Sequence, residues 1–299
     1  MCVIKNMRHL FKRLTDFFIF SNLFIAVAAV LFTVQSQIQL GMHPDWHPYL
    51  FLILFATLFE YNLHKFVAVF FYKHALLEDK FSWIARNLKL FYFIVLSSVA
   101  GFIISACFAK WEVLVTLFPL GVITFLYSFP VYKKGIKIFR LREVPLVKIF
   151  IISLVWSATC ILLPLVQSGL RVDPALVLLL IAERFLFVFA ITVPFDIRDM
   201  ESDKKAGLKT LPLLAGEKRA GMMANAALLL FVVVCGIHYL YMQQVHFAAA
   251  FLLSGFTTLY FLNSPRIKKL EHYHYGVLDG TMALQGLLVI AAYFLFQQA

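Results

Sequence analysis

Acidic residues are concentrated in one short stretch of the chain, DIRDMESDKKAGLKTLP, residues 196–212. Three of them, Asp196, Asp199 and Asp203, are spaced i, i+3 and i+7. On a continuing helix this spacing places the three carboxylates along one face, over about 10 Å. Mg²⁺ usually takes one or two carboxylates together with water molecules and substrate phosphates. The stretch therefore predicts a site for a metal-bridged phosphate ligand, with a solvated polar loop as the plain alternative.

The rest of the chain is strongly apolar. Of its 299 residues, 62% are hydrophobic and 14% are charged, whereas roughly 25% of the residues of a soluble protein are charged. Nine apolar stretches are long enough, at roughly 17 to 25 residues, to cross a hydrocarbon core as helices. They cover residues 16–36, 49–71, 89–108, 112–130, 146–166, 174–195, 219–240, 246–263 and 277–297.

Helices are the expected spanning structure, because every backbone polar group in lipid must be satisfied within the protein. The alternation typical of a membrane barrel is absent from the sequence. We therefore predict an all-α fold, a polytopic membrane protein with a bundle of nine transmembrane helices, and a single domain over residues 1–299. The first apolar core, residues 17–34, is too long for a signal peptide, so we interpret it as the first span.

The basic residues predict how the chain crosses the membrane. With the N-terminus in the cytoplasm, 24 of the 27 Lys and Arg residues lie in the N-terminal tail and the inner connections. By the positive-inside rule we expect a protein of the inner or cell membrane, with the acidic stretch cytoplasmic and the C-terminus on the opposite side. The same rule explains the net charge of +11, so no nucleic-acid partner is expected. The four cysteines have no paired spacing and are expected to be packing residues.

The order D-x-R-D-x-x-x-D-x-x-x-G-x-x-T-L-P, placed after a long apolar span, resembles the second Asp-rich motif of the UbiA superfamily of intramembrane prenyltransferases. The resemblance covers essentially the whole chain. It implies that Asp196, Asp199 and Asp203 are catalytic and bind Mg²⁺ and the diphosphate of a prenyl donor. Ionisation of the donor gives an allylic cation, which a lipophilic acceptor captures. An aromatic acceptor or a quinone precursor is expected, with membrane lipids as the remaining partners.

The sequence departs from the family at the first Asp-rich motif, N-x-x-x-D-x-x-x-D. The corresponding stretch, FEYNLHKFVAVF, has Asn62, but Phe66 and Phe70 replace the two acids. In one interpretation a metal on the second motif suffices, and Asn62, His64 and Lys65 contact the diphosphate directly. In another, catalysis is lost and the protein only binds isoprenoid or lipid diphosphates. His64 and Lys65 could also anchor the helix at the membrane interface.

Basic residues near the ends of other spans extend the predicted diphosphate site. Arg198 lies inside the acidic stretch, and Lys148 lies just inside the fifth apolar run. Both are candidate contacts of the leaving diphosphate, because positive groups stabilise its developing charge. Tyr127 and Lys133, at the end of the fourth span, could line the same site or belong to an aromatic and basic interface belt.

Two further polar residues are predicted to face the interior of the bundle. Arg184 lies about ten residues into the sixth span, where a charge costs about 2.5 to 3.5 kcal/mol on insertion scales. It could meet an anion or an acceptor oxygen, or form an internal ion pair with the adjacent Glu183. Asp279 begins the last span and either closes the pocket or caps that helix. A transporter would need more polar residues at this depth, in paired halves.

Overall fold

The computed structural model describes residues 2–71, 79–128, 132–134, 137–139, 144 and 146–296. The chain divides into two compact units. The first comprises Met1–Leu31 and Trp46–Ala109, and the second comprises Phe32–Asp45 and Lys110–Ala299. The single domain expected over the whole chain stays a prediction.

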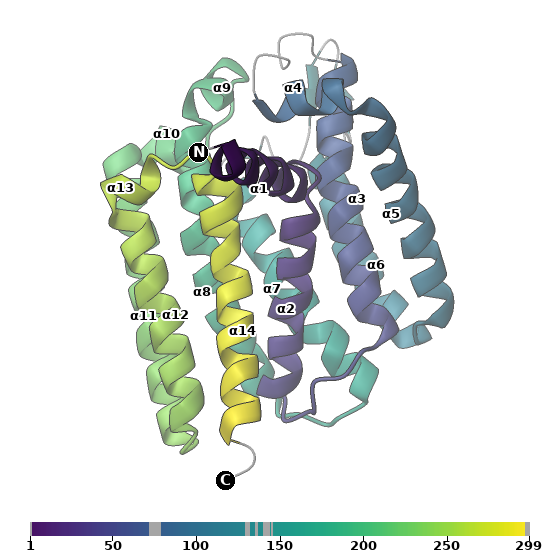
Figure 1. Cartoon of the computed structure of the whole chain (residues 1–299). Coiled ribbons are helices and arrows are strands. Elements are labelled where there is room, and N and C mark those ends of the chain that lie inside the picture. Colours follow the sequence, from purple (N-terminus) through teal and green to yellow (C-terminus); the bar gives the residue numbers. More distant parts are fainter. Residues whose placement is uncertain are drawn as a thin grey trace. The chain divides into compact units, whose positions relative to one another are not determined.

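The first unit is built from helices. They are α1 (Cys2–Phe20), the first part of α2 (Leu23–Gln39), α3 (Pro48–Phe71), α4 (Asp79–Arg86) and α5 (Leu88–Phe108). α3 and α5 lie side by side (Figure 1). A Cβ atom at Gly101 of α5 would lie 2.5 Å from the ring of Phe55 in α3. Glycine at this position therefore lets the two helices approach closely.

The sequence-predicted first span, residues 16–36, is interrupted. Lys12–Phe20 and Leu23–Gln39 meet at an angle of 68°. The chain turns at Asn22, whose φ of 63° lies in the left-handed region, which asparagine tolerates better than most residues. The expectation of one continuous helix here is wrong, because a left-handed residue ends the helical hydrogen-bond pattern.

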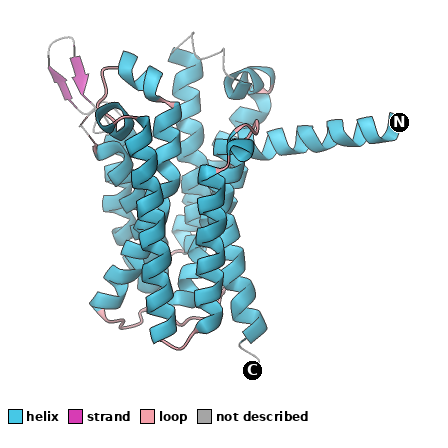
Figure 2. Cartoon of the chain, turned by 90° about the vertical axis from the view of Figure 1, so that its left-hand side faces the viewer, coloured by secondary structure: helices cyan, strands magenta, loops and turns pink. Residues whose placement is uncertain are grey.

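The second unit is also mainly helical. Its elements are α6 (Trp111–Ser128), β1 (Tyr132–Lys134), β2 (Lys137–Phe139), α7 (Val147–Ser168), α8 (Pro174–Arg198), α9 (Met200–Lys205), α10 (Leu211–Ala215), α11 (Glu217–Tyr241), α12 (Val245–Asn263), α13 (Pro265–Lys268), the π-helix η3 (Tyr273–Leu278) and α14 (Asp279–Phe296). The two short strands form an antiparallel hairpin, with Tyr132 opposite Phe139 (Figure 2).

The helices agree with the hydropathy prediction. Six described helices are long and apolar enough to cross a membrane, or seven if the bent pair of α1 and α2 is one span. Two shorter apolar helices cover Pro48–Leu63 and Trp111–Tyr127. Each of the nine predicted stretches thus coincides with helix in the part of the chain that is described. The all-α membrane fold is confirmed, whereas the count of nine spans is not.

α8 carries the acidic stretch at its C-terminal end. The helix begins at Pro174, and the Asp173 side chain caps it by accepting a hydrogen bond of 2.9 Å from the Ala175 N–H. Proline at the first helical position and aspartate at the N-cap are both favourable. The 25 residues of α8 extend over about 37 Å, which is enough to cross a bilayer core.

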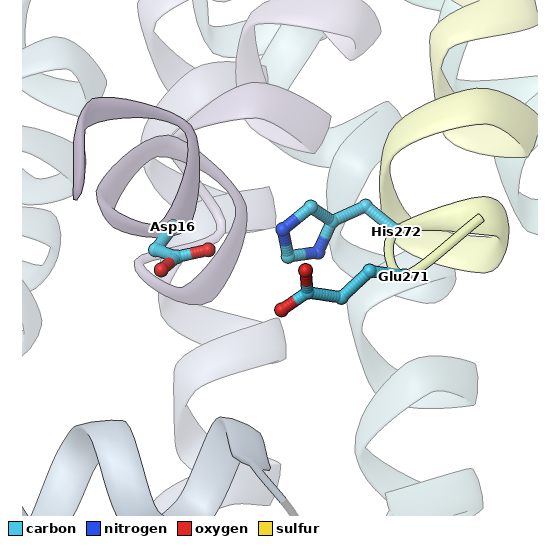
Figure 3. Close-up of side chains that lie close together, drawn as sticks. All are labelled: Asp16, Glu271 and His272. Carbon is cyan, nitrogen blue, oxygen red and sulfur yellow. The ribbon is translucent and has the colours of Figure 1, made fainter. Parts of the chain in front are cut away.

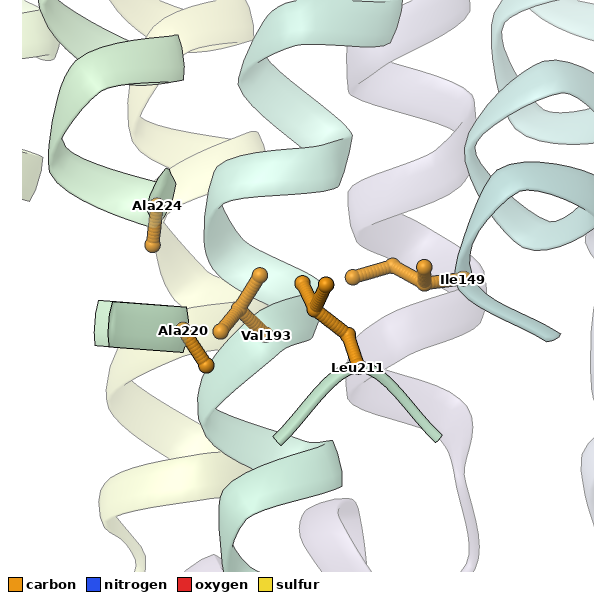
Figure 4. Packing of buried hydrophobic residues seen from close by; sticks show 5 residues of the cluster. All are labelled: Ile149, Val193, Leu211, Ala220 and Ala224. Carbon is orange, nitrogen blue, oxygen red and sulfur yellow. The ribbon is translucent and has the colours of Figure 1, made fainter. Parts of the chain in front are cut away.

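One apolar cluster holds the segment after the acidic stretch against α8. It contains Ile149 of α7, Val193 of α8, Leu211 of α10, and Ala220 and Ala224 of α11 (Figure 4). The two alanines are small, so α11 can approach α8 closely. Leu211 is 7% exposed, and burying such a side chain contributes roughly 1.5 to 3 kcal/mol. α10 is therefore packed against the bundle rather than left as a solvated loop.

Candidate functional site

The acidic stretch begins where α8 ends. Arg198 is the last residue of α8, Asp199 forms a turn with φ −87° and ψ 2°, and α9 starts at Met200. The Asp199 N–H donates to Phe195 O at 3.0 Å, and the Asp203 N–H donates to Asp199 O at 2.8 Å. The turn is tight, but α8 does not continue through it. The expected single helix face for the three carboxylates is therefore wrong.

Two of the three carboxylates nevertheless meet at one lysine. Lys148 Nζ lies 2.8 Å from Asp196 Oδ1 and 3.2 Å from Asp203 Oδ2. Lys148 is the second residue of α7, and the backbone N–H of Leu146 donates to Lys209 O at 3.1 Å. This bond ties the start of α7 to the chain that follows α9. The fold thus brings together an ammonium group and two acids that are far apart in the sequence.

Asp196 is suited to a cation. It is 1% exposed, its Oδ1 faces the Lys148 ammonium at 2.8 Å, and its Oδ2 accepts no hydrogen bond from the described residues. A buried carboxylate oxygen without a donor is unfavourable unless positive charge compensates it. One ammonium group faces two carboxylates here, so negative charge remains. Mg²⁺ prefers oxygen ligands of this kind, and Asp196 and Asp203 therefore fit a divalent cation.

Arg198, rather than Lys148, holds the third carboxylate. Its Nε donates to Asp199 Oδ1 at 2.8 Å and its Nη2 donates to Oδ2 at 3.1 Å, a bidentate arrangement. The guanidinium carbon lies 4.9 Å from the ring centre of Tyr275 and 5.2 Å from that of Phe195. The two side chains are 29% and 34% exposed. This pair can therefore open toward another anion or cation at little cost.

The remnant of the first motif in the other unit has a different chemistry. Asn62 is fully buried, and its Nδ2 donates to Ser21 O at 2.9 Å and to Leu58 O at 2.8 Å. Its Oδ1 accepts from Asn22 Nδ2 at 3.0 Å. Lys65 Nζ donates to Phe20 O at 2.7 Å and to Asn22 Oδ1 at 2.8 Å.

These contacts fix the bend between α1 and α2. The Lys65 ammonium donates to these two neutral oxygens, and Lys65 is 9% exposed. The two donors of Asn62 satisfy backbone carbonyls, one of them at the bend itself. We call Asn22, Asn62 and Lys65 the bend cluster. In this geometry Asn62 and Lys65 support the bend, and their predicted contact with a diphosphate stays a prediction.

The remaining predicted site residues have different outcomes. The side chains of His64, Lys133, Phe66 and Phe70 lie outside the described residues, so their roles stay predictions. Tyr127, in the last turn of α6, lies close enough to Lys148 to interact with it electrostatically.

Asp279 is the first residue of α14 and is 7% exposed. The turn before η3 contains Glu271 and His272 (Figure 3). Asp16, the third residue labelled in that figure, belongs to α1 of the first unit. Sequence reasoning did not single out Tyr275, which lies next to Arg198, because an aromatic residue near a span end is unremarkable in a chain with 33 Phe and 12 Tyr.

Arg184 is buried among neutral acceptors. It is 2% exposed and donates to Phe32 O at 2.9 Å, Ser36 Oγ at 2.8 Å and Gln39 Oε1 at 2.6 Å. Glu183, its expected ion-pair partner, lies 2.7 Å from His238 Nδ1 instead. Arg184 therefore joins α8 to the end of α2.

The apolar helices define an integral membrane protein, and the buried acids at the end of α8 give it a candidate cation site. The model of the UbiA prenyltransferase family matches residues 86–272. The chain belongs to this family, as the acidic stretch indicated.

Two relatives by sequence are archaeal proteins named digeranylgeranylglyceryl phosphate synthase. The protein from Pyrococcus horikoshii is 33% identical over 137 residues, which are 45% of this chain and 43% of that protein. The protein from Methanobrevibacter smithii is 25% identical over 164 residues, covering 52% and 51% of the two chains. The match therefore spans about half the length of these curated relatives.

Solved structures share the fold. A UbiA homolog from Archaeoglobus fulgidus, solved with DMAPP and Mg²⁺, has a TM-score of 0.58 at 15% identity, covering 91% of this chain and 99% of that one. The same homolog with GPP and Mg²⁺ has a TM-score of 0.59 at 16% identity, covering 91% and 99%. At this identity the likeness establishes the arrangement of the helices.

Proposed function

We propose that this protein is an integral-membrane prenyltransferase that moves an isoprenyl group from a polyprenyl diphosphate to a lipophilic acceptor, with Mg²⁺ as cofactor. One observation carries the proposal. Two buried carboxylates, Asp196 and Asp203, meet a lysine ammonium within 3.2 Å at the end of a long apolar helix. Such a cluster offers binding groups for a metal and for phosphate oxygens at the place where an isoprenoid tail could enter the bundle.

The reaction transfers a carbon group and releases pyrophosphate. The bond between the allylic C1 and the diphosphate oxygen breaks, and its electron pair leaves with pyrophosphate. The acceptor nucleophile then forms the new bond to C1 and loses a proton. When bound, Mg²⁺ would neutralise charge that develops on the leaving diphosphate. Asp196 and Asp203 would hold the ion, joined by Asp199 once that carboxylate leaves Arg198.

Basic side chains of the chain assist the same bond cleavage. Lys148 Nζ can turn from its two carboxylates to a diphosphate oxygen as a charge-assisted donor. Arg198, which is partly exposed, can do the same with its guanidinium group. Each cation would exchange a carboxylate partner for a phosphate oxygen and would then stabilise the charge that develops there. The apolar helices of the bundle would shelter the allylic cation from water, which would otherwise capture it.

The acceptor belongs to a lipophilic class. Aromatic compounds and quinone precursors are the acceptors that the sequence predicted. The names of the two archaeal relatives favour a glyceryl phosphate lipid as a second class. Both classes partition into the bilayer, so either can reach an intramembrane site.

The proposed site faces the cytoplasm, with the N-terminus on the same side and the C-terminus opposite. The distribution of Lys and Arg supports this orientation. Cysteine substitutions at Lys204 and at Gln243 would test it, because an impermeant thiol reagent should label the first only from the cytoplasmic side. Labelling of both from one side would contradict it.

Phe66 and Phe70 motivate a second candidate. Without the acids of the first motif, the protein could bind isoprenoid diphosphates and catalyse no transfer. One experiment separates the two candidates. Purified protein is incubated with prenyl diphosphates of several lengths, Mg²⁺ and both acceptor classes, and pyrophosphate and prenylated product are measured. Mg²⁺-dependent product supports the enzyme, binding without turnover supports the second candidate, and full activity in EDTA excludes the proposed metal dependence.

A further inference from the structure

A cavity lies beside the end of α8 and shares Arg198 with the acidic stretch, whereas Lys148, Asp196 and Asp203 are not in its lining. Its volume is about 710 Å³, and its lining comes from the end of α8, the start of α11, the end of α12, α13 and η3. The charged residues of the lining are Arg198, Glu217, Lys218 and Lys268. Arg198 is paired with Asp199, so Lys218 and Lys268 against Glu217 leave this cavity with a net positive charge.

The cavity lies at the edge of the apolar layer. Arg198 is the last residue of α8, Lys218 is the second residue of α11, and Asn263 is the last residue of α12. All three helices are candidate membrane spans. Val193, Ile197 and Leu262 supply apolar walls. A ligand in this place contacts charged groups at one end and hydrocarbon at the other, as an amphiphile requires.

Several donors in the cavity are available to a ligand. Lys218 and Lys268 are exposed, and neither has an ion-pair partner in the described part of the chain. Asn225 and Asn263 exchange hydrogen bonds of 3.0 Å, and Asn263 donates its second N–H to Leu259 O at 2.8 Å. The second N–H of Asn225 has no partner among the same described residues. Two ammonium groups and one amide therefore remain for an anionic acceptor.

We propose that this cavity binds the phosphate headgroup of an anionic membrane phospholipid, whose acyl chains follow the apolar walls into the bilayer. Basic pockets between spans on the cytoplasmic side suit anionic headgroups, and the volume is within the roughly 300 to 1,000 Å³ of ligand sites. A zwitterionic headgroup carries its own cation, which Lys218 and Lys268 repel. The cavity therefore prefers phosphatidylglycerol to phosphatidylcholine.

The proposal is tested by lipid binding to the delipidated full chain in detergent, followed by native mass spectrometry. We expect phosphatidylglycerol to bind more tightly than phosphatidylcholine. The double variant Lys218→Gln, Lys268→Gln should lower phosphatidylglycerol affinity about tenfold or more, since each cation near a headgroup contributes appreciably. The matched control is Arg219→Gln, Lys269→Gln, which removes the same charge one residue away from each lining position and should change affinity less than about twofold.

A third variant tests the cavity itself without changing charge. Gly221 lines it, and a Cβ atom there would meet nothing within 4 Å, so Gly221→Phe fills space without a clash at its first atom. This variant should weaken phosphatidylglycerol binding as strongly as the double lysine variant. The proposal is overturned if both charge pairs weaken binding equally, if Gly221→Phe has no effect, or if inorganic phosphate binds more tightly than the lipid. Activity is not needed for any of these readouts.

Discussion

Two lysines, the half-buried Lys148 and the buried Lys65, lie one in each unit and contact different kinds of oxygen. Lys148 faces the carboxylates of Asp196 and Asp203, whereas Lys65 donates to the Phe20 carbonyl and the Asn22 amide oxygen. A carboxylate is negatively charged, so one cation beside it can be replaced by another. A backbone carbonyl at a helix bend is neutral and needs a hydrogen-bond donor in a fixed position. The first arrangement suits ligand exchange and the second suits permanent structure.

The comparison explains what became of the first Asp-rich motif. Phe66 and Phe70 occupy the positions where the motif of the family has acids, so these positions offer no carboxylate to a metal. Asn62 and Lys65 remain, and in the structure they hold the bend between α1 and α2. The contacts of Asn62 and Lys65 in the structure are thus contacts with the bend, whatever the acids of the motif would have added. Substitutions in the two regions should accordingly change different quantities.

The largest effect is expected from Asp196→Asn. This change removes the charge of the most buried carboxylate in the acidic cluster and keeps its shape. Prenyl transfer should fall by about a hundredfold or more, equivalent to about 2.7 kcal/mol, measured as labelled product. Asp173→Asn is the control, because it makes the same substitution at the other end of α8 and asparagine caps a helix equally well. Retention of more than one tenth of the activity by Asp196→Asn would contradict the assigned role.

Asn62→Asp tests the bend cluster, where stability and not activity should change. Aspartate cannot donate to Ser21 O and Leu58 O, so the variant should lose about 2 to 3 kcal/mol of unfolding free energy. Activity per folded molecule should stay within about threefold. Denaturation in detergent and a product assay measure the two quantities. Asn22→Asp should be milder, since its oxygen already receives the Lys65 ammonium. If Asn62→Asp instead keeps stability and raises Mg²⁺ affinity, Asn62 is a ligand and the comparison fails.

Lys148→Met and Lys65→Met compare the two lysines directly. The first should lower kcat/KM for the prenyl diphosphate about tenfold, or about 1.4 kcal/mol, because a cation near the leaving group is lost. It should also increase the thermal stabilisation that Mg²⁺ gives, since two carboxylates then lack their ammonium partner. The second should lower thermal stability with little change in kcat/KM. Equal kinetic effects of the two variants would refute the distinction.

Arg184→Lys is expected to have the smallest effect. Lysine keeps the charge but cannot reproduce the fork that reaches Phe32 O, Ser36 and Gln39. We expect a loss of about 1 kcal/mol of stability and unchanged transfer, measured by thermal denaturation and by the product assay. A large kinetic defect would mean that Arg184 contacts a substrate and does not belong with the structural cations.

Hydropathy predicted the helices well because bilayer thickness fixes how long an apolar stretch must be. It could not place the bend at Asn22 or the turn at Asp199. The conformation at Asn22 depends on its hydrogen bond with Asn62. The chain after Asp199 is held in place by the packing of Leu211. Local composition contains no signal for such partners.

The candidate site was predictable in its residue types but not in its pairings. The spacing of Asp196, Asp199 and Asp203 indicated a cation site, and Lys148 was a candidate from its position near the start of a span. That Lys148 faces Asp196 follows from how α7 packs on α8, whereas Arg198 pairs with the adjacent Asp199 at the turn that ends α8. The sequence likewise could not reveal that Lys65 binds neutral oxygens, because this requires the bend that brings Phe20 O within 2.7 Å.

The direction of α8 has a consequence for the acids at its end. Peptide dipoles add up along a helix and leave a partial negative charge at the C-terminus, which is where Asp196 and Asp199 lie. Carboxylates at that terminus are repelled by the helix itself, so nearby cations stabilise its last turn by about 0.3 to 1 kcal/mol each. Removing them should fray this terminus before any other part of α8, which hydrogen exchange of the amides near Asp199 would detect. Ion binding and the local stability of this helix end should therefore change together.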